Sequence, residues 1–253
     1  MTRPVLLIGG MDSSGGAGLA RDLLAVHDAG LTAHMAVTIV TAQTDRAVLA
    51  VEPVSPTVLI AQIDAALEDG VGAVKIGAMG NAAFVRIVAA RLPDVPVVLD
   101  PVLCSSSGHT LLEPAGIRAL LEDILPHTTV LTPNLPELAT LGTALGFDVS
   151  AGQGDVVAAL LAQGCQSVLV KGGHDHQAPS ATDILYQRDG LPLSFGSVRY
   201  PFDLRGTGCQ LASGLAAGLA QGNFIPQAVR AARAGLEDRF RMEQARLSRA
   251  CSV

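Results

Sequence analysis

The sequence lacks the cysteine spacing of metal sites and disulfide frameworks. Its four cysteines, Cys104, Cys165, Cys209 and Cys251, form no Cys-x-x-Cys pair. This argues against a zinc site and a disulfide-stapled fold, so we expect reduced thiols. The stretch His174-Asp175-His176 offers two imidazoles without a partner cluster, and we interpret it as a solvated loop.

Long apolar runs and an excess of positive charge are also missing. No stretch of about 18 apolar residues occurs, and the apolar run at residues 5–8 is too short for a signal-peptide core. The formal net charge is -6, which disfavours a nucleic-acid or membrane-surface partner. We therefore expect a cytoplasmic protein that binds neither nucleic acid nor a membrane.

Lysine is scarce, because only Lys75 and Lys171 occur among the 17 basic residues. Each lies at the end of a strand-like apolar run, close to a glycine. A compact ammonium group there can reach a phosphate where a planar guanidinium does not fit. Chance placement is the alternative, but the two glycines that follow Lys171 favour a phosphate contact for that lysine.

The sequence does contain alternating strand-like and helical segments. The strand-like runs lie at 4–9, 34–40, 73–77, 96–100, 128–132 and 167–171; helical segments lie at about 16–29, from 55 onward, and at 80–92, 113–124, 134–143, 151–164, 207–221 and 226–248. This alternation predicts a mostly parallel sheet with helices on both faces. Asp189-Gly190, between runs at 183–187 and 193–200, predicts an antiparallel edge hairpin. No linker is evident, so we expect residues 1–253 to form one domain.

Two glycine-rich segments each follow a strand-like run and open a helix. Glycines at residues 9–18 permit close approach of a ligand, although a tight turn alone would also explain them. Residues 205–209 read Arg-Gly-Thr-Gly-Cys. Amides at the start of the following helix would form an anion hole for a transferring phosphoryl group. Cys209 lies in the first helical turn, where a thiolate is favoured; a small buried cysteine is the alternative.

Polar residues follow two further strands. Asn134 and Glu137 are three residues apart at a helix start and could together hold Mg²⁺. A capping box explains the same pair. Asp100, before Pro101 at a strand end, is placed for metal or phosphate chemistry, or for initiating a turn.

Seven motifs in this order resemble one family. They are the loop at 12–18, Thr41-Ala42-Gln43, Val74-Lys75-Ile76-Gly77, Leu99-Asp100-Pro101-Val102, the run at 131–137, Val170-Lys171-Gly172-Gly173-His174 and Gly206-Thr207-Gly208-Cys209. Over about residues 4–240 the chain resembles the hydroxymethylpyrimidine/phosphomethylpyrimidine kinases of thiamine biosynthesis. These belong to the ribokinase-like superfamily, as pyridoxal kinases do. The resemblance implies a three-layer α/β sandwich, ATP and Mg²⁺ as cofactors, a small pyrimidine substrate and a homodimer.

The resemblance also implies residue roles. Gly206, Thr207 and Gly208 would form the anion hole, and Cys209 would accept or relay the substrate proton where the superfamily's sugar kinases carry an aspartate. The pyrimidine pocket would contain Gly10, Asp12, Gln43, Ala78 and Val102, with Gln43 on the aminopyrimidine edge. Lys171, Asn134 and Thr207 would meet ATP, and Asp100, Asn134 and Glu137 would organise Mg²⁺.

The sequence departs from the family pattern at several positions. Arg205 stands where the family often has histidine, which adds a cation beside the anion hole. Thr44 replaces a common asparagine, Ala78 replaces a usual methionine, and residues 103–108 lack a lysine seen in some members. We predict phosphorylation of hydroxymethylpyrimidine and of its monophosphate. A pyridoxal kinase and a non-catalytic pyrimidine sensor are the alternatives, and the intact catalytic motifs disfavour the sensor.

Overall fold

The computed structural model describes residues 2–105, 107–173 and 180–250, so the His174 loop lies outside the described residues. Its described strands form one nine-stranded sheet in the order β3-β2-β1-β4-β5-β6-β7-β8-β9. Neighbours from β2 to β7 pair in parallel, while β3, β8 and β9 are antiparallel. The strands are β1 (Val5–Asp12), β2 (Ala33–Gln43), β3 (Val48–Pro53), β4 (Ala73–Ile76), β5 (Val97–Leu99), β6 (Val130–Leu131), β7 (Ser167–Val170), β8 (Ser180–Gln187) and β9 (Leu193–Val198).

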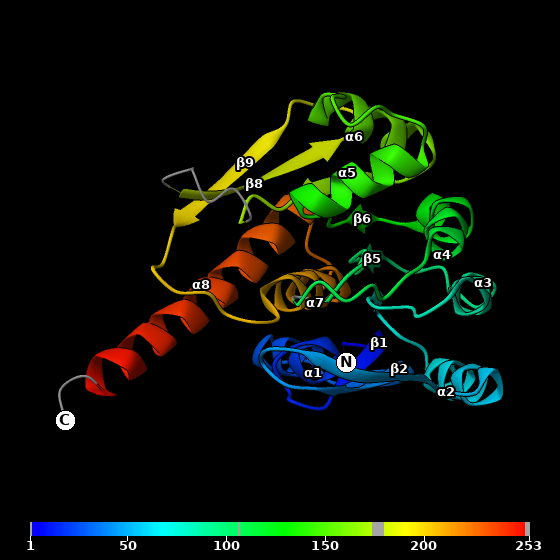
Figure 1. The fold of residues 1–253 in the computed structure, drawn as a ribbon, viewed down its shortest axis with the longest axis horizontal. Helices are drawn as coiled ribbons and strands as arrows, with labels where there is room; N and C mark the ends of the chain where they lie inside the picture. Colours follow the sequence, from blue (N-terminus) through cyan, green and yellow to red (C-terminus); the bar gives the residue numbers. More distant parts are fainter. Residues whose placement is uncertain (1, 106, 174–179, 251–253) are drawn as a thin grey trace.

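Helices cover both faces of the sheet, as Figure 1 shows. They are α1 (Gly18–Asp28), α2 (Pro56–Glu68), α3 (Ala82–Ala89), α4 (Pro114–Ala119) with a π-helical continuation (Leu120–Ile124) and a 3₁₀ turn (Leu125–His127), α5 (Leu135–Ala144), α6 (Gln153–Ala162), α7 (Thr207–Ala220) and α8 (Ile225–Ala250). Strand residues alternate between two apolar cores: Leu6 and Ile8 face α2–α6, whereas Val5 and Leu7 face α1, α7 and α8. The predicted three-layer sandwich, a mostly parallel sheet with helices on both faces, is thereby confirmed, as is the hairpin of β8 and β9.

Strand β3 was not among the strands predicted from the sequence. Its side chains are mostly exposed, and Leu49 has 71% of its surface exposed. An edge strand of this kind lacks the burial alternation that reveals a strand in a sequence. β3 pairs with the C-terminal half of β2. A turn at residues 44–47 joins the two strands beside the carboxyl end of β1.

β1 is longer than the sequence indicated. Its pairing with β2 shifts register between Gly9 and Met11 and then continues to Asp12. A bulge of this kind bends a strand and re-aims its side chains. The extension carries Asp12 beyond the body of the sheet, to the edge at which the parallel strands end.

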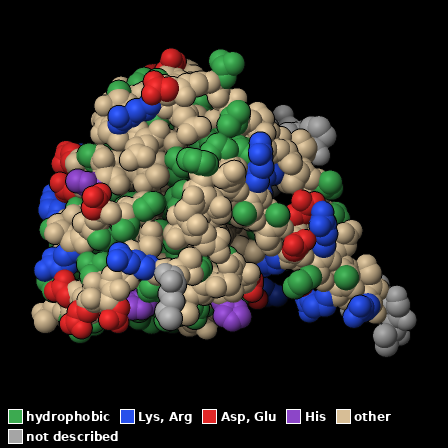
Figure 2. Space-filling model, turned by 180° about the vertical axis from the view of Figure 1, so that it is seen from behind, with side chains coloured by type: hydrophobic (Ala, Val, Ile, Leu, Met, Phe, Trp, Pro, Cys, Tyr) green, Lys and Arg blue, Asp and Glu red, His purple; other side chains and the backbone are tan. Residues whose placement is uncertain are grey.

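Helix α8 projects from the body towards the C-terminus (Figure 1). On the face shown in Figure 2, Lys and Arg side chains are interspersed with Asp and Glu among the described residues. A helix capable of crossing a membrane was not found in the described part of the chain.

Candidate active site

A cavity of about 750 Å³ opens where the parallel strands end. Parallel α/β sheets place ligands at this edge because loops there diverge and helix N-termini point towards it. The cavity is lined by every residue predicted for the site: Gly10, Asp12, Gln43, Ala78, Asp100, Val102, Asn134, Glu137, Lys171, Gly206, Thr207, Gly208 and Cys209. The fold therefore brings the separate motifs together, while the roles of the residues stay predictions.

The turn before α7 has the geometry of a helix N-terminus that can bind an anion. Gly206 has φ of 70°, in the left-handed region, and a β-carbon there would collide with the carbonyl oxygen of Gly16. The N-cap residue Gly206 has no side chain to cap the helix that begins at Thr207, and no side-chain cap is formed within the described part of the chain. The first amides of α7 thus remain available to a bound anion.

Lys171 faces this turn from the end of β7. A β-carbon at Gly208 would lie 3.1 Å from Lys171 Nζ. The same ammonium group lies 2.7 Å from Asp100 Oδ1 and 3.6 Å from Glu137 Oε2. Burial lowers the pKa of Lys171, but Asp100 and Glu137 raise it more, so the net pKa lies above its usual value. The lysine is a fixed cation between two carboxylates and the anion hole.

Asn134 and Glu137 form the capping box of α5. Asn134 Oδ1 accepts from the Glu137 amide at 2.8 Å, and Glu137 Oε2 accepts from the Asn134 amide at 2.7 Å. Burial raises the pKa of Glu137, and the Lys171 charge opposes that rise. The structural interpretation of this pair is therefore confirmed, whereas its metal-binding role stays a prediction. Within the described residues, no group of three or more His, Cys, Asp or Glu forms a preformed metal cluster.

Opposing influences act on the protonation state of Cys209. A helix N-terminus favours a thiolate, yet burial raises the pKa of Cys209 to about 11. The Lys75 charge lowers that pKa, while Asp22 and Asp100 raise it. Desolvation of the half-buried Cys209 therefore opposes the thiolate that the helix start favours.

The residues expected to bind a pyrimidine line the same cavity. Gln43 Oε1 accepts from Thr41 Oγ1 at 3.2 Å, which leaves its amide nitrogen for a ligand. Gly10 lies so close to Ile39 that a β-carbon would approach within 2.9 Å. The Asp12 carboxylate is already engaged, since Oδ1 accepts from the Ser14 amide at 2.8 Å and Oδ2 from the Ala17 amide at 3.0 Å. Asp12 thus shapes the glycine loop.

Two features of the site were not predicted from the sequence. Lys75 Nζ forms a fully buried ion pair with Asp22 Oδ2 at 2.7 Å, and Ser213 Oγ donates to Asp22 Oδ1 at 2.7 Å. The scarcity of lysine was a signal for Lys75, but nothing in the α1 sequence marked Asp22. Three aromatic side chains also line the cavity, and the Tyr200 ring stacks on Phe240 at 4.9 Å. Phe202 completes this group.

The chain is similar to known kinases. A family model described as phosphomethylpyrimidine kinase matches residues 12–251. A hydroxymethylpyrimidine/phosphomethylpyrimidine kinase of Rhizobium meliloti is 40% identical over 241 residues, covering 93% of this chain and 90% of the relative. The crystal structure of a Clostridium difficile phosphomethylpyrimidine kinase aligns with TM-score 0.79 and 31% identity, over 94% of this chain and 99% of that one. A Staphylococcus aureus pyridoxal kinase in complex with ADP aligns with TM-score 0.82 and 27% identity, over 94% and 87%.

Proposed function

The chain belongs to the phosphomethylpyrimidine kinase family, and from this premise we propose that it phosphorylates hydroxymethylpyrimidine and then the resulting monophosphate. In the first step the hydroxymethyl oxygen bonds to the γ-phosphorus of ATP and the bond to ADP breaks. The hydroxyl proton passes to the thiolate form of Cys209, which is the minor form at neutral pH because the pKa of this thiol is raised to about 11. The chain is a kinase, and its family implies the use of ATP.

One observation carries the proposal: the Lys171 ammonium group lies directly beside the anion-hole turn, so close that a β-carbon added at Gly208 would lie 3.1 Å from Nζ. Phosphoryl transfer depends on positioning and charge neutralisation rather than on covalent chemistry. The amides at residues 207–209 and the Lys171 ammonium supply both at one place. Gln43 and Ala78 lie on the wall where the acceptor would bind.

Mg²⁺ fits the carboxylates next to Lys171. Asp100 and Glu137 are hard oxygen donors, and Mg²⁺ beside a nucleotide commonly uses one or two carboxylates together with phosphate oxygens. Glu137 Oε2 takes the capping and lysine contacts, so Oε1 is the oxygen we assign to the ion or its waters. When bound, the ion would neutralise charge on the phosphates.

Further properties follow as proposals from the same premise. All the described strands belong to one sheet, which supports a single kinase domain over residues 1–253. A homodimer follows from the family resemblance. Cytoplasmic localisation stays a prediction from the sequence.

Turnover with purified protein tests the function. With Mg²⁺-ATP we expect ADP release with hydroxymethylpyrimidine and with its monophosphate, because both present an oxygen nucleophile to the same phosphoryl group. Pyridoxal, measured in parallel, is the control for substrate class. Turnover with pyridoxal and with neither pyrimidine would contradict the proposed substrate while leaving kinase chemistry intact.

Glu137→Gln tests the metal assignment. Glutamine can still accept the hydrogen bond from the Asn134 amide, so the α5 cap should survive, while Lys171 keeps Asp100 as its ion-pair partner. Loss of the carboxylate charge should lower kcat/KM for Mg²⁺-ATP roughly tenfold and raise the Mg²⁺ concentration needed for half-maximal rate. A Mg²⁺ titration at fixed ATP measures this. An unchanged titration curve would remove Glu137 from the metal site.

A further inference from the structure

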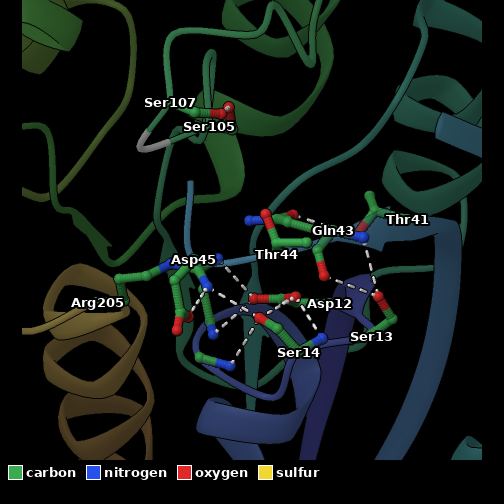
Figure 3. Close-up of polar contacts among 12 residues, drawn as sticks. Asp12, Ser13, Ser14, Thr41, Gln43, Thr44, Asp45, Ser105, Ser107 and Arg205 are labelled. Atoms are coloured by element: carbon green, nitrogen blue, oxygen red, sulfur yellow. Dashed lines mark hydrogen bonds and ion pairs between the residues drawn. The ribbon is translucent and has the colours of Figure 1, made fainter. Parts of the chain in front are cut away.

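Arg205 immediately precedes the anion-hole turn, and the chemistry described so far does not use its guanidinium. Nη2 donates to Asp12 Oδ2 at 2.9 Å, while Nη1 donates to Ser14 Oγ and to Asp45 Oδ1, each at 2.8 Å. Figure 3 shows the side chain reaching from the start of α7 to these groups. One arginine thus joins the phosphate turn, the glycine loop and the turn between β2 and β3.

The two carboxylates that hold Arg205 differ in exposure. The Asp12 side chain is 5% exposed and is fixed by loop amides, whereas the Asp45 side chain is 83% exposed. Exposed ion pairs contribute little because water competes with them. Asp12 therefore holds one edge of the guanidinium in place, and Asp45 is a partner that a stronger anion can replace.

The position of Arg205 matches the needs of the second phosphorylation. Arg205, Gln43 and Cys209 line the same cavity. In the second step a phosphate oxygen of the monophosphate attacks the γ-phosphorus of ATP, and the bond to ADP breaks. That phosphate must face the anion-hole turn, beside Arg205. It carries close to two negative charges and matches the planar fork of an arginine.

We propose that Arg205 recognises the phosphate of the monophosphate substrate, and that Asp45 is a placeholder that the phosphate displaces. This inference rests on the proposed function. The first phosphorylation needs no such contact, because its acceptor is an uncharged alcohol. Arg205 is accordingly a specificity residue for the second step, and Asp45 is its competitor.

Two substitutions with opposite expected effects test the proposal. Arg205→Gln should raise KM for the monophosphate about 10- to 100-fold, the worth of a charge-assisted hydrogen bond, with much less effect on KM for the alcohol. Asp45→Asn should lower KM for the monophosphate about two- to fivefold by removing the competitor. Arg46→Gln is the matched control, because Arg46 is exposed and belongs to the same turn as Asp45. Its backbone amide donates to Thr44 Oγ1, a contact that the substitution keeps. Both KM values should stay unchanged.

Calorimetric titration of the monophosphate without nucleotide gives a readout independent of turnover, and the dissociation constants should follow the KM values. Equal changes for both substrates in Arg205→Gln would show a structural role and overturn the proposal. Unchanged or weaker monophosphate binding in Asp45→Asn would overturn it too. If the wild type phosphorylates the alcohol but not the monophosphate, the role of Arg205 is rejected while the first phosphorylation stands. If the wild type neither binds nor phosphorylates either pyrimidine, the proposed function itself is rejected.

Discussion

Replacing Cys209 with alanine is expected to lower kcat by about 10²- to 10⁴-fold, the usual contribution of a general acid or base. The side chain is small, and Gln43 rather than Cys209 is the residue expected to hold the pyrimidine. Affinity for hydroxymethylpyrimidine should therefore stay close to that of the wild type. Single-turnover kinetics and calorimetric titration separate the two quantities.

The raised thiol pKa gives this prediction a pH signature. Because the pKa of Cys209 is about 11, the thiol is protonated at neutral pH, and the thiolate fraction rises about tenfold for each pH unit below that value. The wild-type kcat should therefore rise with pH between about 7 and 9, and Cys209→Ala should lose this dependence. Protonation of the ATP phosphates also changes with pH, and the pH dependence that remains in the alanine variant measures that contribution.

Cys209→Asp provides a rescue test. The family resemblance implies that sugar kinases of the superfamily carry an aspartate at this place, and a carboxylate is a base at lower pH than a thiol. Part of the activity should return, with a flatter pH profile. An alanine variant that keeps the wild-type kcat would show that Cys209 takes no part in the chemistry. The amides of α7 would then be the main source of the rate enhancement.

Much of the fold could be predicted because the central strands are buried on both faces. Residues 97–99 and 167–170 read as compact, largely apolar runs, and such runs identify strands of a parallel sheet. The β8–β9 hairpin was marked by its Asp189-Gly190 turn. β3 carried no comparable signal, because an exposed edge strand is stabilised by its pairing with β2 and not by burial.

The motifs that form the site could be predicted from the sequence, but the contacts between their side chains could not. Local sequence places Asn134 and Glu137 on one helical turn, and their capping box followed from spacing alone. The contact between Arg205 and Asp45 joins residues 160 positions apart, so only the folded chain reveals it. The pKa of Cys209 likewise depends on desolvation and on charges from distant elements, which the local helix argument does not include.

Breaking the buried pair of Lys75 and Asp22 is expected to have the largest effect on stability. Both side chains are 1% exposed, and removing one partner leaves an uncompensated charge in a desolvated site. Lys75→Met should therefore lower the free energy of unfolding by about 3–5 kcal/mol. Urea denaturation measures this loss. The exposed pair of Arg91 and Asp64 is the matched control, and Asp64→Asn should cost less than about 1 kcal/mol.

The double substitution decides between the charge and the packing of Lys75 as the cause. Lys75→Met combined with Asp22→Asn removes both charges and keeps an acceptor for Ser213 Oγ. If the unpaired charge dominates, the double variant should be more stable than Lys75→Met alone, despite one unpaired amide donor that costs about 1–3 kcal/mol. Additive losses would show that packing of the lysine stem is responsible. The charge interpretation also predicts that Lys75→Met raises the Cys209 pKa further, because the lysine charge is the main influence that lowers it.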